Sequence, residues 1–133
     1  MYNGPTFLQG YESTGTGLLD FQNPTGDWIE WQVSSDSAGL ETIAFRYVLP
    51  KANRPLELKV NGVVSVPSLN FPKTASWSDW QLVQVQVPLV EGNNMIRITA
   101  IGQSGGNFDS LIVGGSSSQS GSGGENPITA VYI

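Results

Sequence analysis

The segment Trp28–Val33 reads Trp-Ile-Glu-Trp-Gln-Val, and it places Ile29, Trp31 and Val33 on one side, with the residues between them on the other. Successive side chains of a β-strand point to opposite faces, so this period of two is typical of a half-buried strand. The residues just before it, Asn23–Gly26 (Asn-Pro-Thr-Gly), are of the types that form turns. The stretch therefore predicts a strand that follows a turn.

The same period of two recurs along the chain between turn signals. Four further runs show it: Glu41–Val48, Leu56–Val60, Leu82–Val87 and Met95–Ile101. Asn61–Gly62 is a strong hairpin signal, because both residues tolerate positive φ. No convincing amphipathic helical pattern is present. Short strands at regular spacing in a chain of this size predict an all-β domain, a jelly-roll-like β-sandwich or, as the competing closure, a barrel.

The composition excludes several classes of function. The chain has 133 residues, with 6 basic and 11 acidic side chains, a net charge of −5, no His and no Cys. This length corresponds to one domain with a real core. Without thiolate or imidazole groups, disulfides, zinc or iron–sulfur sites and imidazole relays are excluded, so a metal would need oxygen ligands.

The charge and hydropathy also bear on partners. A net negative charge opposes the contacts to phosphate that nucleic acid binding requires, so no nucleic acid partner is expected. No stretch approaches the roughly 20 apolar residues of a membrane span, and the polar start Met1–Gly4 does not resemble a signal sequence. No membrane partner is expected either.

The C-terminal part of the chain has a different composition. Residues Gly114–Gly124 contain only Gly, Ser and Gln, which is typical of a flexible linker after a domain at 1–113. The run 125–133, Glu125–Ile133, then has the composition and length of a single strand. A lone strand needs an edge to pair with, so we expect it to complete its own sandwich or to insert into a second copy. The alternative is the frayed start of a further module.

The polar residues give little support to an enzyme. Asp27, Glu30, Asp79 and Asp109 lie in separate parts of the chain, apart from the neighbours Asp27 and Glu30, and no local motif pairs two carboxylates as glycoside hydrolysis requires. No nucleophile elbow or phosphate-binding loop stands in the required strand-to-helix context. The sequence therefore predicts a non-catalytic protein.

Two aromatic residues lie beside turn signals, where a strand partner cannot easily bury them. These are Tyr11 and Trp77. The C–H-rich face of a pyranose stacks on such rings, so loop aromatics indicate sugar binding. The alternative is that they cover the core as half-buried side chains. We expect Trp31 and Trp80 to belong to the core, since Trp80 leads directly into a strand.

Ten short motifs, in this order, give the chain its resemblance to a known group. They are Gly10–Tyr11, Thr14–Gly17, Asp20–Phe21, Gly26–Trp31, Arg54–Leu56, Val60–Gly62, Phe71–Pro72, Ser76–Trp80, Asn94–Ile98 and Gly106–Leu111. Together they resemble carbohydrate-binding modules of family 35 and the related family 6, from about Tyr2 to Val113. Arg54–Leu56 and Phe71–Pro72 favour family 35. The resemblance implies a β-sandwich that tethers a secreted glycoside hydrolase or lyase to cell-wall polysaccharide.

The resemblance also implies site residues. In these families two aromatics flank a sugar and an Asn binds its hydroxyls, and the matching ligand-binding positions are Tyr11, Trp77 and Asn107. Such modules usually begin with a strand that carries Glu-x-Glu, whose carboxylates, with an Asp matching Asp109, hold one structural Ca²⁺. Here that strand is absent from the front, and the tail resembles it after circular permutation, with Thr129 and Val131 near the positions of the glutamates. The loss of two carboxylates puts the calcium in doubt.

Several alternatives stay open at this point. The second hypothesis is a small hydrolase or lyase, and the third is a structural or adhesive module that binds protein at a sheet edge, which buried Tyr11 and Trp77 would favour. The sugar is not identified, although Lys51, Arg54 and Lys73 could meet a carboxylated one. We expect an extracellular module that is a monomer or a strand-swapped dimer.

Overall fold

The computed structural model describes residues 2–9, 17–51, 53–102, 106–113 and 129–132. These residues form eleven strands: β1 (Tyr2–Asn3), β2 (Thr6–Gln9), β3 (Gly17–Asp20), β4 (Thr25–Ser35), β5 (Gly39–Val48), β6 (Leu56–Val60), β7 (Val63–Leu69), β8 (Gln81–Leu89), β9 (Gly92–Ile101), β10 (Asn107–Val113) and β11 (Thr129–Tyr132). The part of the chain that the structure describes contains no helix. The predicted all-β class is confirmed, and each of the five predicted strands lies within an observed one.

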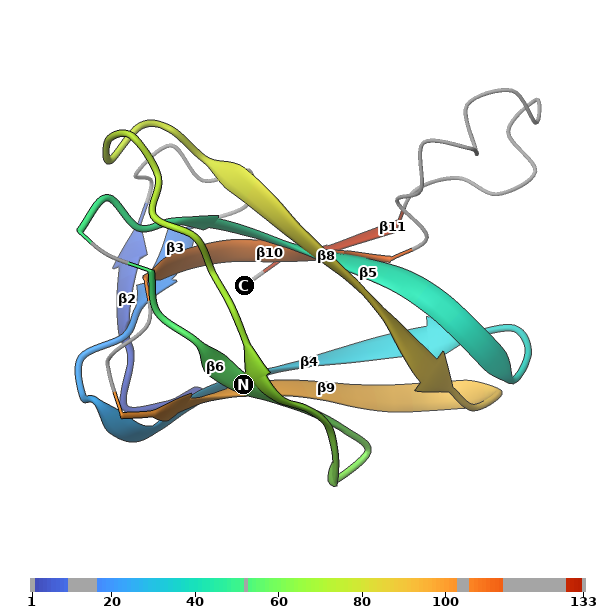
Figure 1. Cartoon of the computed structure of the whole chain (residues 1–133). Coiled ribbons are helices and arrows are strands. Elements are labelled where there is room, and N and C mark those ends of the chain that lie inside the picture. The colour runs from blue at the N-terminus through green and yellow to red at the C-terminus, as the bar shows by residue number, and fades with distance from the viewer. Residues whose placement is uncertain (1, 10–16, 52, 103–105, 114–128, 133) are drawn as a thin grey trace.

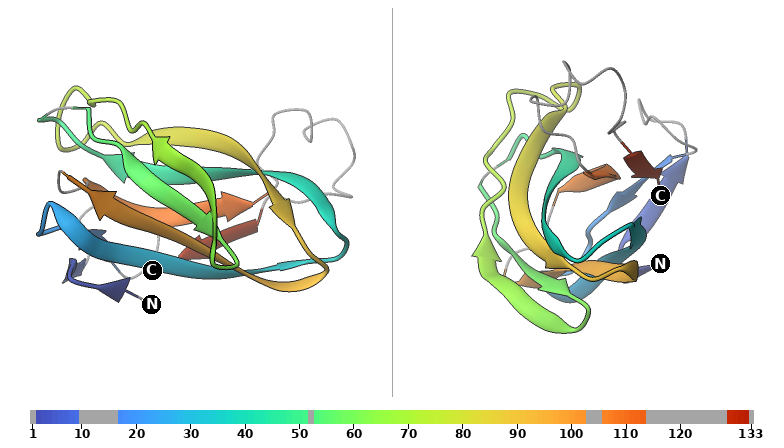
Figure 2. Two further views of the ribbon diagram at one scale, coloured as in Figure 1. Left: turned by 60° about the horizontal axis from the view of Figure 1, so that its bottom comes forward. Right: turned by 90° about the vertical axis from the view of Figure 1, so that its right-hand side faces the viewer.

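The strands form two antiparallel sheets that face each other (Figures 1 and 2). One sheet has the order β1-β4-β9-β6-β7, and the other has the order β2-β3-β10-β5-β8, with β11 added beside β10. The predicted β-sandwich is therefore confirmed over the barrel. The hairpin predicted at Asn61–Gly62 joins β6 and β7, with φ values of 53° and 82°.

The core lies between the two sheets and follows the alternation of the sequence. Strand β4 directs Ile29, Trp31 and Val33 inward, and each of these side chains is at most 3% exposed. The prediction that Trp31 belongs to the core is confirmed. Around Phe108 the rings of five further core aromatics lie within 6.5 Å, centroid to centroid: Phe21, Trp31, Phe45, Tyr47 and Phe71. Such edge-to-face and stacked contacts add to the free energy gained by burial.

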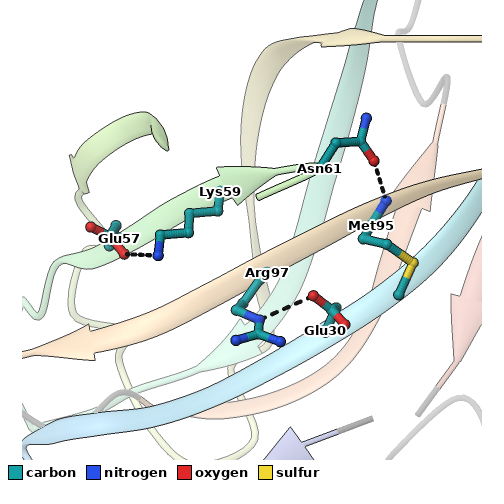
Figure 3. Close-up of polar contacts among 6 residues, drawn as sticks. All are labelled: Glu30, Glu57, Lys59, Asn61, Met95 and Arg97. Carbon is teal, nitrogen blue, oxygen red and sulfur yellow. Dashed lines mark hydrogen bonds and ion pairs between the residues drawn. The ribbon is translucent and has the colours of Figure 1, made fainter. Parts of the chain in front are cut away.

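The outer face of the five-stranded sheet carries polar cross-strand pairs (Figure 3). Arg97 Nε donates to Glu30 Oε2 at 3.0 Å, and the Arg97 guanidinium carbon lies 3.8 Å from the ring centroid of Trp28. This arrangement is the solvent-facing half of the alternation that the sequence predicted for β4.

Strand β11 pairs antiparallel with β10, from Ser110 opposite Tyr132 to Val113 opposite Thr129. Strand β5 pairs with β10 along the other edge, while β3 pairs with the beginning of β10 at Asn107 and Phe108. Strands β3 and β11 therefore share one edge of β10, one at each end. The predicted linker Gly114–Gly124 and residue Glu125 lie outside the described residues.

Candidate functional site

Three segments meet at one end of the sandwich: the chain after β5, the loop of residues 70–80 before β8, and the start of β10 (left in Figure 1). Leu49 and Thr74 join the first two. Leu49 N donates to Thr74 Oγ1 at 3.0 Å, and Thr74 N donates to Leu49 O at 2.8 Å. Thr74 is only 3% exposed, so these hydrogen bonds are shielded from water. The loop is thereby attached to the end of β5.

Trp77 lies in this loop and is 53% exposed. Asp79 holds the loop beyond it, because Asp79 Oδ2 accepts from Ala75 N at 2.8 Å and Asp79 Oδ1 accepts from Gln81 Nε2 at 2.6 Å. An exposed indole between two braced positions is presented to solvent with little freedom to collapse onto the core. The exposure of Trp77 does not favour the adhesive alternative, which burial of Tyr11 and Trp77 would have favoured.

Tyr47 supports the same loop from below. Its hydroxyl donates to Pro72 O at 2.6 Å, and its ring packs on Phe71 with centroids 5.2 Å apart. Burial, and secondarily the negative charge of Asp79, raise the pKa of Tyr47 above its ordinary value. The hydroxyl therefore stays protonated as a donor at neutral pH.

Asn107 is the first residue of β10 and lies opposite Val48 on one side and Asp20 on the other. Its Oδ1 is buried and has no hydrogen-bond partner among the described residues. Gly106 brings this part of the chain close to β5: a Cβ there would lie 2.5 Å from Val48 O and 2.9 Å from Leu49 Cβ. The structure thus brings Asn107 to the end of β5 from which the Trp77 loop is held.

Asp20 lies beside Asn107 and was not among the site residues predicted from the sequence. It ends β3 directly opposite Asn107 and is half-buried. The signal available in the sequence was the alternation of Leu19 with Asp20, which places a carboxylate on the face away from the core. Tyr11, the other predicted platform residue, lies outside the described residues.

Asp109, the candidate calcium ligand, is fully buried and forms an ion pair with Arg46, whose Nη1 lies 2.9 Å from Asp109 Oδ2. Within the described ranges no three acidic, His or Cys residues cluster as metal ligands would. A hard cation prefers several carboxylate or carbonyl oxygens, whereas a guanidinium repels it. The described residues around Asp109 therefore do not fit a calcium ion.

Trp80 differs from its predicted place in the core. It is half-buried and lies outside the core cluster formed by the described residues, with the Arg46 guanidinium carbon 4.4 Å from its ring centroid. The reason is that Arg46 of β5, distant in sequence, covers the ring as a cation–π partner. The prediction that Trp80 is a core residue was wrong.

Comparison with known proteins identifies the family. The model of the carbohydrate binding module (family 6) matches residues 9–113. The chain is 36% identical over 100 residues to an exo-beta-D-glucosaminidase of Amycolatopsis orientalis, which covers 74% of this chain and 10% of that protein. It is 35% identical over 106 residues to endo-1,4-beta-xylanase B of Cellvibrio japonicus, with coverages of 77% and 18%. The chain thus spans less than a fifth of either relative.

Solved structures agree with this match. A family 35 module from Clostridium thermocellum superposes with a TM-score of 0.79 at 34% identity, covering 84% of this chain and 88% of that one. A family 35 module from Paenibacillus barcinonensis gives 0.83 at 31% identity, with coverages of 87% and 92%. A third, Xyl-CBM35 in complex with a glucuronic acid containing disaccharide, gives 0.74 at 29% identity, with coverages of 87% and 88%. The chain therefore belongs to the carbohydrate-binding modules, matching the family 6 model in sequence and family 35 modules in structure.

Proposed function

We propose that this module binds polysaccharide at the end of the sandwich that carries Trp77 and Asn107, and that Tyr11, which lies outside the described residues, is the second aromatic of the ligand site. The observation that carries the proposal is the exposed ring of Trp77 on a loop held at Thr74 and Asp79. An indole face stacks on the apolar face of a pyranose, while an amide beside it binds the hydroxyls of the rim. The function is binding without catalysis.

The polar groups of the site support binding rather than hydrolysis. Both oxygens of Asp79 accept hydrogen bonds that hold the loop, so this carboxylate serves the loop and is not presented to a ligand. Hydrolysis of a glycosidic bond generally needs two carboxylates facing each other across the substrate. Asp20, opposite Asn107, is a second carboxylate near the site, and no described contact places it across a substrate position from Asp79.

The context of the relatives suggests what the module is for. The similar segments are small parts of a much longer exo-beta-D-glucosaminidase and a much longer endo-1,4-beta-xylanase. We infer that this module likewise tethers a secreted polysaccharide-degrading enzyme to plant or microbial cell-wall polysaccharide. No step of this function is assigned to calcium, because Asp109 is engaged by Arg46.

Replacement of the aromatic platform tests the proposal. Trp77→Ala and Tyr11→Ala should each weaken binding to xylan, mannan or β-glucan by about 1–3 kcal/mol, as the loss of a stacking ring does elsewhere. Affinity gels and calorimetry measure the effect. Tyr2→Ala is the matched control, since Tyr2 is an exposed ring of β1 in the other sheet. Unchanged binding in both platform variants would contradict the assignment.

Asn107→Ala separates a ligand contact from a turn-stabilising role. Because Asn107 Oδ1 has no partner among the described residues, its removal should leave the melting temperature near that of the wild type. The affinity should fall by about 1–2 kcal/mol, the value of one or two hydrogen bonds. A large loss of stability with retained affinity would show that Asn107 serves the fold.

A further inference from the structure

Asp20 and Asn107 form a pair of polar side chains on adjacent strands of the site. They lie directly opposite each other in β3 and β10, and such residues have Cβ atoms about 4.5–5.5 Å apart on the same face. Their chain neighbours Leu19 and Phe108, also opposite each other, are buried in the core at 1% and 0% exposure. Asp20 and Asn107 therefore both lie on the outer face, and both are half-buried.

The two groups complement each other toward a sugar. A carboxylate accepts hydrogen bonds, whereas an amide both donates and accepts. Asn107 Oδ1 is a buried acceptor without a partner among the described residues, and buried polar atoms are nearly always paired. A ligand with neighbouring hydroxyls would satisfy Asn107 Oδ1 and the Asp20 carboxylate together, because each hydroxyl can donate to one of them.

In its half-buried position, the ionised form of the Asp20 carboxyl group lowers the stability of the fold. Burial raises the pKa of Asp20, and a hydrogen bond from Gln22 and the charge of Lys51 lower it by less. A carboxyl whose pKa is raised on folding holds its proton more tightly in the folded state. Its ionised form therefore destabilises the protein at neutral pH, and this penalty disappears as the pH falls through the folded pKa. Stability lost in this way is typical of a residue that serves binding.

We propose, on the basis of the binding function above, that Asp20 determines specificity: with Asn107 it binds neighbouring hydroxyls of a neutral pyranose and disfavours uronic acids. A ligand carboxylate at this position would meet a charge of the same sign. The positive charge of Lys51 acts on the Asp20 carboxylate, and the negative charge of Asp20 offsets it. Lys51 therefore does not give this position a net positive charge. This preference would distinguish the module from the relative that was solved with a glucuronic acid containing disaccharide.

The test compares wild type, Asp20→Asn and Asp36→Asn by calorimetry with two sets of probes. The neutral probes are xylohexaose, mannohexaose and cellohexaose, and the acidic ones are trigalacturonate and a glucuronic acid-substituted xylo-oligosaccharide, all with EDTA. Asp36→Asn is the matched control, because it removes the same charge from an exposed turn between β4 and β5, at the opposite end of β5. Thermal melts at pH 7 confirm folding, and Asp20→Ser is a second variant that also removes the carboxylate.

We expect wild type to prefer a neutral probe, and Asp20→Asn to lose about tenfold or more of that affinity, as loss of a charged hydrogen-bond acceptor does. Affinity for the acidic probes should stay the same or rise in Asp20→Asn, and its melting temperature at pH 7 should rise. Asp36→Asn should bind as wild type does. Tighter binding of acidic probes by wild type, or unchanged neutral binding in Asp20→Asn, overturns this inference alone. If the wild-type protein binds none of these probes, the proposed function is overturned as well.

Discussion

Arg46 compensates the one fully buried carboxylate for which the structure gives an ion pair. Asp109 is 0% exposed, whereas the Arg46 side chain is 23% exposed and reaches solvent past the ring of Trp80. Taking a carboxylate out of water costs several kcal/mol unless an opposite charge and hydrogen bonds compensate it. Arg46 thus supplies a positive charge beside the buried carboxylate of Asp109.

Arg46→Gln should lower the free energy of unfolding by about 3 kcal/mol, because it leaves Asp109 buried without its counter-charge. Urea unfolding at pH 7 measures this loss. Wild type should melt at the same temperature in EDTA and in millimolar CaCl₂. The control is Lys59→Gln. Lys59 Nζ lies 3.8 Å from Glu57 Oε1, and this ion pair is more exposed, so its contribution to stability should be small. A melting temperature that rises clearly with calcium would contradict the role given to Arg46.

Single residues could be predicted from the sequence where the local pattern determines their environment. Trp31 follows the alternation of its strand, and Trp77 stands among turn residues, so their burial and exposure were foreseeable. Trp80 and Asp20 were not, because their environments depend on Arg46 and Asn107, which are far away in sequence. A single sequence does not show such cross-strand neighbours until the register is known.

At the scale of elements, the strands with strict alternation were predictable, and the short or irregular strands were not. Strand β7, Val63–Leu69, contains Pro67 and lies at the edge of its sheet, so its side chains do not alternate between buried and exposed. Strand β3 has only four residues. Both depend on their partners in the sheet rather than on a local pattern, which explains why the sequence analysis did not predict them.

The loop of residues 70–80 depends on Thr74 for its place. Thr74→Val keeps the shape of the side chain but removes the acceptor for Leu49 N and the donor to Ser76 O. We expect a loss of about 1–2 kcal/mol in stability, because Leu49 N is left buried and unpaired. The affinity for polysaccharide should fall as well, because Trp77 is then less well held. Chemical unfolding and calorimetry measure the two effects.

Thr25→Val is the control for this experiment, since Thr25 is exposed at the start of β4. It should change neither stability nor affinity. Thr74→Val with reduced stability but full affinity would show that the position of Trp77 does not depend on this residue.

At the scale of the whole molecule, strand β11 occupies the edge of β10 that β3 leaves free. Directly paired antiparallel strands need a connection of only about 2–5 residues. Residues 114–128 separate Val113 from Thr129, which are opposite each other, so the connection is far longer than the pairing requires. A long Gly- and Ser-rich tether lets the same strand pair within its chain or with a second copy, and within one chain its effective concentration is in the millimolar range.

Deletion of residues 125–133 tests whether β11 completes the sandwich. Without β11 the second half of that edge of β10 is exposed, so the truncated protein should lose several kcal/mol of stability and aggregate more readily. Thermal melts of the full and truncated chains measure the loss, and a peptide of residues 125–133 added to the truncated protein should restore part of it. Size-exclusion chromatography should show a monomer at micromolar concentration, because the tether favours pairing within one chain, and a swapped dimer only as the concentration approaches the millimolar range. A tail without a structural role would instead give equal melting temperatures for the full and truncated chains, and the added peptide would have no effect.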